Sequence, residues 1–211
     1  MKTLVFSDVH GNLPAFEKML KEEHECEAFI CLGDLVNYGP WSNECVELAL
    51  ELPNVQLLMG NHEEAFLAGS YPGENVLVQK FFNINYKTFK NNHIIKSFLE
   101  SYQLAGFICK HTINNQYIYP NTDVTLNNNY IIGHSHHQFK YINNNFALYN
   151  AGSVGQNRKF INVIDYLIFD GDTNFIEMKQ LVYDFRLLVK EMKDRGFPKE
   201  CIDYYLQKKT R

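Results

Sequence analysis

The sequence predicts an α/β protein in which two stacked β-sheets are flanked by helices. The first hundred residues alternate short apolar runs with amphipathic patterns, which is typical of βαβ units and a largely parallel sheet. From about Ala105 onward the pattern changes to short strands with asparagine-rich turns, which favours antiparallel hairpins. With 211 residues the chain is expected to form a single domain over residues 1–211.

Hydrophobic periodicity sets the expected elements of the first half. Buried strands are expected at 3–7, 28–32 and 55–59. Amphipathic helices are expected at 13–25 and 42–52. Asn12 and Pro14 begin the first of these helices, and Ser42 caps the second. Residues 62–103 have a helical pattern, which predicts a cap-like helical segment at about 64–104.

The second half is expected to consist of short strands followed by two helices. The strands are expected at 104–110, 116–120, 129–133, 139–142, 146–150, 160–170 and 174–180. Runs of three asparagines at 127–129 and 143–145 are expected to form turns. Two short C-terminal helices are expected at about 184–207, separated by the sequence RGFP.

Composition and charge exclude several classes of protein. The chain is 45% hydrophobic and 21% charged, which is typical of an ordinary globular protein. Its five cysteines are odd in number and scattered, so we expect reduced, buried thiols rather than disulfides or a zinc ribbon. The start lacks a signal-peptide pattern and no apolar run is long enough to span a membrane, so we expect a cytoplasmic protein. The net charge of −4 gives no general attraction to nucleic acid.

Polar side chains able to bind a metal or accept a proton follow five of the predicted strands. In the first half they are Asp8, His10, Asp34, Asn61 and His62. In the second half they are His111, His134 and His136. Ligands of open α/β sheets bind beyond the carboxyl ends of the strands, so the loops of the first half should converge on one crevice.

Spacing and glycines support a shared site. Residues two apart in an extended chain point the same way, so Asp8 can act with His10, and His134 with His136. A glycine directly before such a residue lets the backbone approach an ion or phosphate closely. Singly, each residue has an ordinary alternative as a helix cap, a turn former or a surface histidine. Coincidence is a poor explanation for a potential ligand or proton acceptor at all five strand ends.

Five blocks of the sequence resemble the signature motifs of the calcineurin-like metallophosphoesterases, in the family's order. They are DVH, GDLVNYG, GNHE, a later isolated histidine and GHSH. LYNAGSVGQNR and the closing VYDFRLLVKEMKDRGFP resemble the compact bacterial branch of this superfamily. The resemblance implies an αββα sandwich with a two-metal site at the ends of the sheets.

The resemblance also implies a set of metal ligands. The first ion would be held by Asp8, His10, Asp34 and His136. The second would be held by Asp34, Asn61, His111 and His134, with Asp34 bridging the pair. Carboxylate, imidazole and amide ligands without thiolate suit divalent Mn, Fe, Ni, Co or Zn better than Ca, and manganese is favoured. A hydroxide bridging the two ions would attack the phosphoryl group.

His62 matches the family histidine that protonates the leaving group, with orientation or phosphate contact as the alternative role. The phosphoprotein phosphatases carry an aspartate that supports this histidine and an arginine that binds phosphate, where this sequence has Asn37 and Tyr38. A protein phosphatase is therefore disfavoured. Glu63 also replaces the more common aspartate of the GNH block.

Three other assignments have competing interpretations. His111 ends a strand-like run and is preferred as the isolated ligand over His93, which lies in a helical pattern. Arg158 is a candidate for phosphate contact, because a guanidinium matches phosphate oxygens; a salt bridge or a solvated turn is its alternative. His137 is out of phase with its neighbours and is expected at the rim or in solvent, and His24 is expected in solvent.

The segment 75–99 carries four lysines among aromatic residues and no acidic residue. Such a pattern can bind a nucleotide, because bases stack on rings and phosphates attract lysine. An amphipathic helix with buried rings and solvated lysines is the alternative, and we prefer it.

These observations predict a dinuclear metal-dependent phosphoesterase that hydrolyses a small phosphodiester or a nucleotide-like phosphate. A dinucleoside polyphosphate hydrolase and a phosphomonoesterase remain alternatives within this class. A protein-interaction scaffold on the same fold, as in the retromer subunit, is an alternative from another class, although no expected ligand is missing here. A nuclease would need a basic groove, which the net charge does not support. The oligomeric state is left open.

Overall fold

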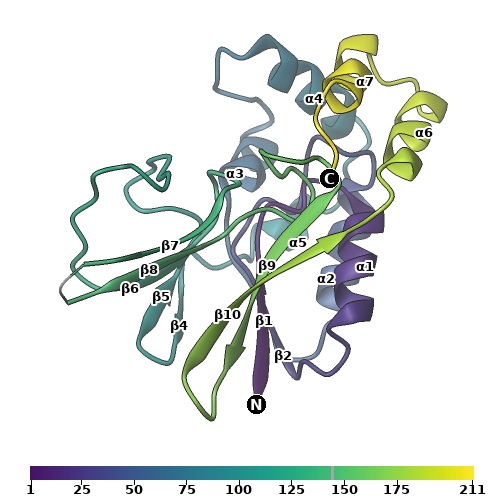
Figure 1. The fold of residues 1–211 in the computed structure, drawn as a ribbon. Coiled ribbons are helices and arrows are strands. Elements are labelled where there is room, and N and C mark those ends of the chain that lie inside the picture. The colour runs from purple at the N-terminus through teal and green to yellow at the C-terminus, as the bar shows by residue number, and fades with distance from the viewer. Residues whose placement is uncertain (144) are drawn as a thin grey trace.

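The structure is a computed structural model that describes residues 1–143 and 145–211. Two five-stranded mixed sheets form the centre of the protein (Figure 1). The first sheet has the order β10 (Phe175–Val182), β9 (Val163–Asp170), β1 (Lys2–Phe6), β2 (Ala28–Cys31), β3 (Val55–Leu57). The second has the order β4 (Tyr102–Leu104), β5 (Phe107–Cys109), β6 (Asn129–Ile132), β8 (Ala147–Ala151), β7 (Gln138–Ile142). The two-sheet α/β architecture predicted from the sequence is confirmed.

Strand direction differs between the centre and the edges of each sheet. β1, β2 and β3 are parallel, whereas β9 runs antiparallel to β1 and forms a hairpin with β10. In the second sheet β5, β6 and β8 are parallel, and β4 and β7 are antiparallel edges. The expectation of antiparallel hairpins in the second half is confirmed for β4–β5, β7–β8 and β9–β10, and it was wrong for the parallel pairs β5–β6 and β6–β8. The long connection between β5 and β6 lets the chain return in the same direction, which local sequence does not indicate.

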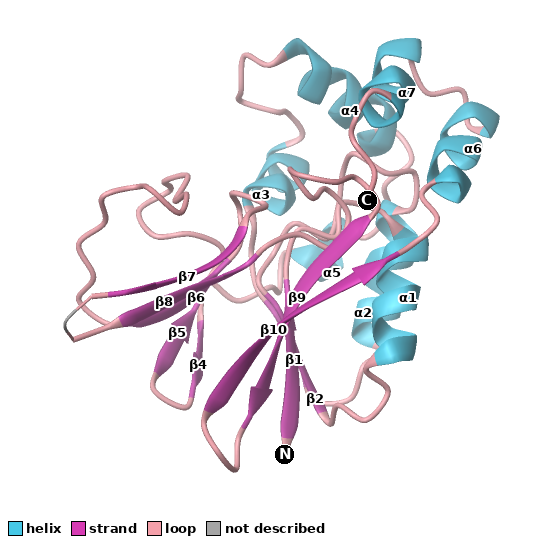
Figure 2. Cartoon of the chain, viewed as in Figure 1, coloured by secondary structure: helices cyan, strands magenta, loops and turns pink. Residues whose placement is uncertain are grey.

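Seven helices lie among the described residues, and Figure 2 shows them beside and above the strands. They are α1 (Leu13–Glu22), α2 (Ser42–Leu50), α3 (Asn61–Ala68), α4 (Val76–Tyr86), α5 (Asn92–Ile95), α6 (Arg186–Asp194) and α7 (Lys199–Leu206). The Asn12 side chain caps α1 by accepting the Ala15 N–H. Ser42 does not cap α2 as expected, because its hydroxyl accepts the Asn37 N–H and so stabilises the loop after β2.

The core has separate layers on the two faces of the first sheet. Leu4 and Phe6 of β1 pack with Phe16 of α1 on the helix side, while Val5 packs with Ile131 of β6 between the sheets. This alternation follows from the two-residue period of a strand. All five cysteines are buried, free thiols. No helix of the described residues is long and apolar enough to cross a membrane.

Two local expectations are corrected. The predicted strand at 116–120 is irregular, because Ile118 packs against the outer face of the second sheet as part of the β5–β6 connection. The predicted strand at 104–110 is a hairpin of β4 and β5 that turns at Ala105 and Gly106, both with positive φ. In the segment 75–99, the rings of Phe81, Phe82 and Phe89 are buried, as in the preferred amphipathic alternative. Of the expected turn at 143–145, Asn144 lies outside the described residues.

Candidate metal centre

The polar residues that follow the strands come together at one end of the two sheets. Three groups of buried side chains have donor atoms close enough to share an ion: Asp8, His10 and His136; His10, Asp34 and His62; Asp34, His111 and His134. They come from the loops after β1, β2, β5 and β6 and from the first turn of α3. Loops of both sheets thus build one site, which extends the crevice expected from the first half alone. That these residues bind metal stays a prediction.

The backbone at this site adopts an uncommon conformation. Five site residues have φ between 51° and 68°, in the left-handed region that residues other than glycine rarely occupy: Asp8, His10, Asp34, His134 and His136. Such conformations persist where the surrounding structure enforces them, and they cluster at functional sites. The left-handed turns direct these side chains toward one another.

Two of the glycines that precede site residues permit close approach. A Cβ at Gly60 would collide with the Asp34 carboxylate and lie 2.5 Å from the Asp34 nitrogen. A Cβ at Gly133 would collide with the Ser7 hydroxyl and lie 2.6 Å from Asp8 Oδ2. The glycines are therefore required because the loops pack directly on the two carboxylates.

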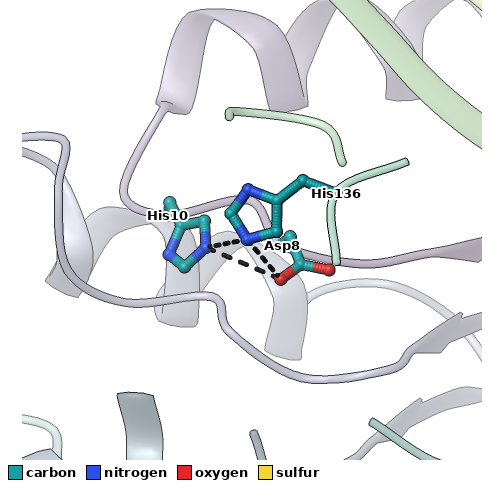
Figure 3. Close-up of side chains that lie close together, drawn as sticks. All are labelled: Asp8, His10 and His136. Carbon is teal, nitrogen blue, oxygen red and sulfur yellow. Dashed lines mark hydrogen bonds and ion pairs between the residues drawn. The ribbon is translucent and has the colours of Figure 1, made fainter. Parts of the chain in front are cut away.

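Asp8, His10 and His136 form the first group (Figure 3). The His136 Nε2 lies 3.1 Å from Asp8 Oδ1, and the His10 Nε2 lies 3.6 Å from the same oxygen. The two Nε2 atoms are 3.2 Å apart. Figure 3 shows both rings turned edge-on toward the carboxylate. The three atoms thus surround a common point.

Asp34, His111 and His134 form the second group, and Asn61 lies beside them. The His111 Nε2 is 3.3 Å from Asp34 Oδ2, 3.1 Å from Asn61 Oδ1 and 3.0 Å from His134 Nδ1. Asp34 Oδ2 also lies 3.8 Å from His10 Nε2 of the first group. Asp34 is therefore the carboxylate that lies between the two groups.

Backbone carbonyls fix how three of the histidine rings are protonated. The Nδ1 atoms of His10, His111 and His136 lie 3.2, 3.0 and 2.9 Å from the carbonyl oxygens of Val36, Leu32 and Gln156 respectively. A carbonyl only accepts, so each Nδ1 carries a proton, and in a neutral ring the Nε2 lone pair faces the site. Metal-binding histidines are commonly oriented in this way.

The unpaired atoms of the site fit a cation. The Nε2 atoms of His10 and His136 face each other across 3.2 Å, and Asp8 Oδ1 is buried with no hydrogen-bond partner. Burial lowers the pKa of His134 and of His136 to about 4, which keeps both rings neutral and able to donate a lone pair. A cation placed between these atoms would satisfy all of them.

The carboxylates are held in their ionised form. Burial opposes ionisation of Asp8, yet His136 and His10 keep its pKa well below the usual range. The same balance lowers the pKa of Asp34, mainly through His111. Burial opposes protonation of His111, but the Asp34 carboxylate raises its pKa to about 10. The site therefore carries two anionic carboxylates and favours positive charge beside them.

Glu63 connects the loops that carry Asp34 and Asn61. Its fully buried carboxylate accepts the N–H groups of Asp34, Leu35 and Val36 at 2.7, 2.7 and 3.2 Å, and that of Gly60 at 3.0 Å. The longer side chain that replaces the family's more common aspartate thus reaches across two loops. The sequence showed the glutamate but gave no sign of these four bonds.

His62 lies at the edge of the site and is held by Asn37. The Asn37 Nδ2 donates to His62 Nδ1 at 2.9 Å, which leaves the proton of the neutral ring on Nε2. The His62 N–H donates to Asp34 Oδ1 at 2.9 Å. Burial lowers the pKa of His62 to about 3. The asparagine therefore contacts the histidine without supplying the negative charge of an aspartate.

The other predicted residues fall as follows. His93 is exposed on α5, so the structure brings His111 and not His93 to the site. His137 lies outside the three groups, with its ring against Tyr119 at 5.5 Å, and His24 is exposed. Arg158 lines a pocket with Asp34 and His62, and its Nη1 donates to the Tyr204 hydroxyl at 3.3 Å.

Two pockets adjoin the site and share Asn61, Tyr117 and His134. The first, of about 320 Å³, is polar and is lined by Glu64, Glu100, Lys110, Thr112 and Asn115, among others. The second, of about 220 Å³, contains His62 and Arg158 and is lined by Tyr38, Tyr71, Tyr117 and Tyr204. Sequence reasoning missed these tyrosines as site residues. Only Tyr38 carried a signal, because it lies within the GDLVNYG block.

Comparisons with known proteins identify the family of the chain. A model of the family "calcineurin-like phosphoesterase" matches residues 1–173. The chain is 30% identical to an uncharacterized protein of Methanocaldococcus jannaschii, covering 92% of this chain and 93% of that protein. A metallophosphoesterase structure from Sphaerobacter thermophilus has a TM-score of 0.80 at 22% identity, covering 98% of each chain. The structure of an archaeal phosphodiesterase has a TM-score of 0.50 at 18% identity, covering 86% of this chain and all of that one. The chain belongs to the calcineurin-like phosphoesterase family.

Proposed function

We propose that the protein is a dinuclear metal-dependent phosphoesterase that hydrolyses a small phosphodiester or a nucleotide-like phosphate. The observation that carries the proposal is the pair of buried donor groups joined at Asp34, with lone pairs and an orphaned carboxylate oxygen directed at common points. The first ion would be held by Asp8, His10, Asp34 and His136. The second would be held by Asp34, Asn61, His111 and His134, with manganese favoured.

Two such ions would supply positive charge for the phosphoryl group and activate water as the nucleophile. The protein's own contribution is to place charged side chains at the site and to fix their positions. Two anionic carboxylates against two dications leave a net positive site, which attracts an anionic ester. Arg158 adds a guanidinium on the side of His62, suited to a phosphate oxygen.

His62 would act on the leaving group. In the neutral ring fixed by Asn37, the Nε2–H is the group available to stabilise or protonate a departing oxygen. His62 lines the second pocket, called the tyrosine pocket after Tyr38, Tyr71, Tyr117 and Tyr204, but it does not line the first, polar pocket. The leaving group would therefore depart toward the tyrosines. A diester has two substituents, and the two pockets offer one space for each. The archaeal phosphodiesterase of the same fold supports the choice of a diester.

The test is a metal-by-substrate screen of the purified protein. Metal-free protein is reconstituted with Mn, Fe, Ni, Co or Zn and assayed on bis-para-nitrophenyl phosphate and on para-nitrophenyl phosphate, with metal content measured by mass spectrometry. We expect two ions per chain and faster cleavage of the diester. Preparations that bind two ions and cleave neither ester would refute the enzyme assignment and leave the fold as a scaffold.

A further inference from the structure

The tyrosine pocket, beside His62, is lined by four tyrosines, of which the polar pocket shares Tyr117: Tyr38, Tyr71, Tyr117 and Tyr204. Its tyrosines come from four separate places: the loop after β2, the α3–α4 connection, the β5–β6 connection and helix α7. Leu77 and Val78 at the start of α4 add an apolar wall. Four distant segments thus present rings to one space of about 220 Å³.

The rings are placed directly against the histidines of the site. Tyr71 stacks on His62 with ring centroids 5.7 Å apart and an interplanar angle of 14°. Tyr117 stacks on His134 with centroids 3.9 Å apart and an angle of 26°. Any group that leaves the phosphorus on the side of His62 therefore enters between aromatic rings.

Burial of the tyrosines separates structural from available rings. Tyr38 is 6% exposed and packs on Phe81 of α4, so it is part of the core. Tyr71 and Tyr204 are partly exposed, and Tyr117 is 51% exposed although it lines both pockets. Partly exposed rings around a polar centre can stack on a flat ligand. Such stacking contributes favourable binding free energy for any aromatic group.

We propose that the tyrosine pocket is the leaving-group subsite and that it selects an aromatic leaving group, such as an aryl alcohol or a base-bearing nucleoside. This inference rests on the proposed function, because it takes the site beside the pocket to cleave a phosphate ester. In the reaction the P–O bond to the leaving alcohol breaks as the oxygen of a water bonds to phosphorus. The departing oxygen takes a proton from His62 Nε2, and a proton released by the water replaces it. Tyr71 and Tyr204 are the specificity-determining rings.

The hydroxyl group of Tyr204 has a second role in this pocket, separate from that of its ring. This hydroxyl accepts from Arg158 Nη1 at 3.3 Å and donates to Gln156 Oε1 at 3.0 Å. The backbone carbonyl of Gln156, a different oxygen, accepts from His136 Nδ1 at 2.9 Å. The ring faces the pocket while the hydroxyl positions Arg158, so removing the hydroxyl and removing the ring should have different effects.

The test compares two esters that share a methyl substituent and differ in the leaving group. Phenol and hexafluoroisopropanol have similar acidity, so phenyl methyl phosphate and hexafluoroisopropyl methyl phosphate differ mainly in aromaticity. The ratio of their kcat/KM values is measured in the manganese-loaded wild type, Tyr71→Leu, Tyr204→Leu and Tyr204→Phe. A ratio cancels any general loss of activity that a variant suffers.

We expect the wild type to prefer the phenyl ester, and each leucine variant to reduce that preference about three- to tenfold. Tyr204→Phe keeps the ring and should keep the preference, while its KM for both esters rises because Arg158 loses its anchor. Tyr119→Leu is the matched control, because Tyr119 is 40% exposed and lines neither pocket. Its preference should equal that of the wild type.

A binding measurement keeps the inference testable apart from turnover. Calorimetry with phenylphosphonate and cyclohexylphosphonate, which are similar in size, should show tighter binding of the flat ring by the wild type and equal binding by Tyr71→Leu. An active enzyme with no phenyl preference, or with a preference untouched in both leucine variants, overturns the subsite and leaves the proposed function intact. Absence of cleavage of any ester overturns both.

Discussion

The Nδ2 of Asn37 lies 2.9 Å from the Nδ1 of His62, where an aspartate would have placed a negative charge. The amide donates to the ring nitrogen, and burial keeps the pKa of His62 at about 3. The neutral form therefore persists above that pH. The asparagine is a positioning residue, since it acts through the histidine.

We predict that Asn37→Asp raises the pKa of His62 by about 1 unit or more, because a carboxylate would accept the Nδ1–H and favour the imidazolium. The measurement is an NMR titration of the His62 ring in metal-free protein. Asn37→Ser is the control, since it removes the donor without adding charge and should give a smaller shift. An unchanged titration in Asn37→Asp would show that the contact does not govern the protonation of His62.

We predict different consequences for two residues of the site. Asp34→Asn should lose both metal and activity, because an amide nitrogen would face His111 in place of the shared carboxylate. His62→Ala should keep two ions per chain and lose turnover by about 10²- to 10⁴-fold. Metal content and kcat are measured on the same preparations, with the exposed Asp123→Asn as control. Wild-type turnover in His62→Ala would remove the leaving-group role.

We predict that Glu63→Gln destabilises the metal-free protein by about 1–3 kcal/mol, because the amide group would direct N–H donors at backbone N–H donors. Urea unfolding measures the change in the free energy of unfolding. Glu64→Gln is the matched control, since Glu64 is the exposed neighbour. Equal stability of the two variants would mean that the four bonds to Glu63 contribute little.

We predict that Lys208 makes stability depend on pH. Its Nζ is buried without a hydrogen-bond partner and lies 4.2 Å from the centroid of the Tyr204 ring. Burial, and then the nearby Arg158, lower its pKa from 10.5 to about 7. The unfolded chain therefore binds more protons between pH 7 and 10.5, so stability should rise with pH in that window, by at most about 1.4 kcal/mol per pH unit.

Lys208→Met should flatten this rise and be more stable than the wild type at pH 7, because no buried ammonium remains. The free energy of unfolding is measured by urea titration at several values between pH 6 and pH 10. The exposed neighbour provides the control variant Lys209→Met, which should follow the wild-type curve. A stability curve for Lys208→Met that runs parallel to the wild-type curve would contradict the assignment of this pH dependence to Lys208.

Much of the fold and site could be predicted from the sequence, because the signals are local. Apolar runs such as 28–32 mark strands by their own composition, and the order of the motif blocks marks Asp8, Asp34 and His134 as one set. The family resemblance implied that His136 lies beside His10, and the two Nε2 atoms are 3.2 Å apart. A candidate ligand that directly follows a strand can be identified from the sequence once the strand itself is recognised.

Only the tertiary structure decided the features that depend on distant segments. The parallel return of β6 beside β5 depends on how a long connection crosses the sheet, which no short pattern encodes. Tyr204 reaches Arg158 from a helix 46 residues further along the chain, and Glu63 bonds a loop 28 and 29 residues before it. The sequence thus determined which side chains the candidate site contains. Packing of remote elements determined the shape of the pocket beside it, because a pocket is formed by residues that are neighbours only in space.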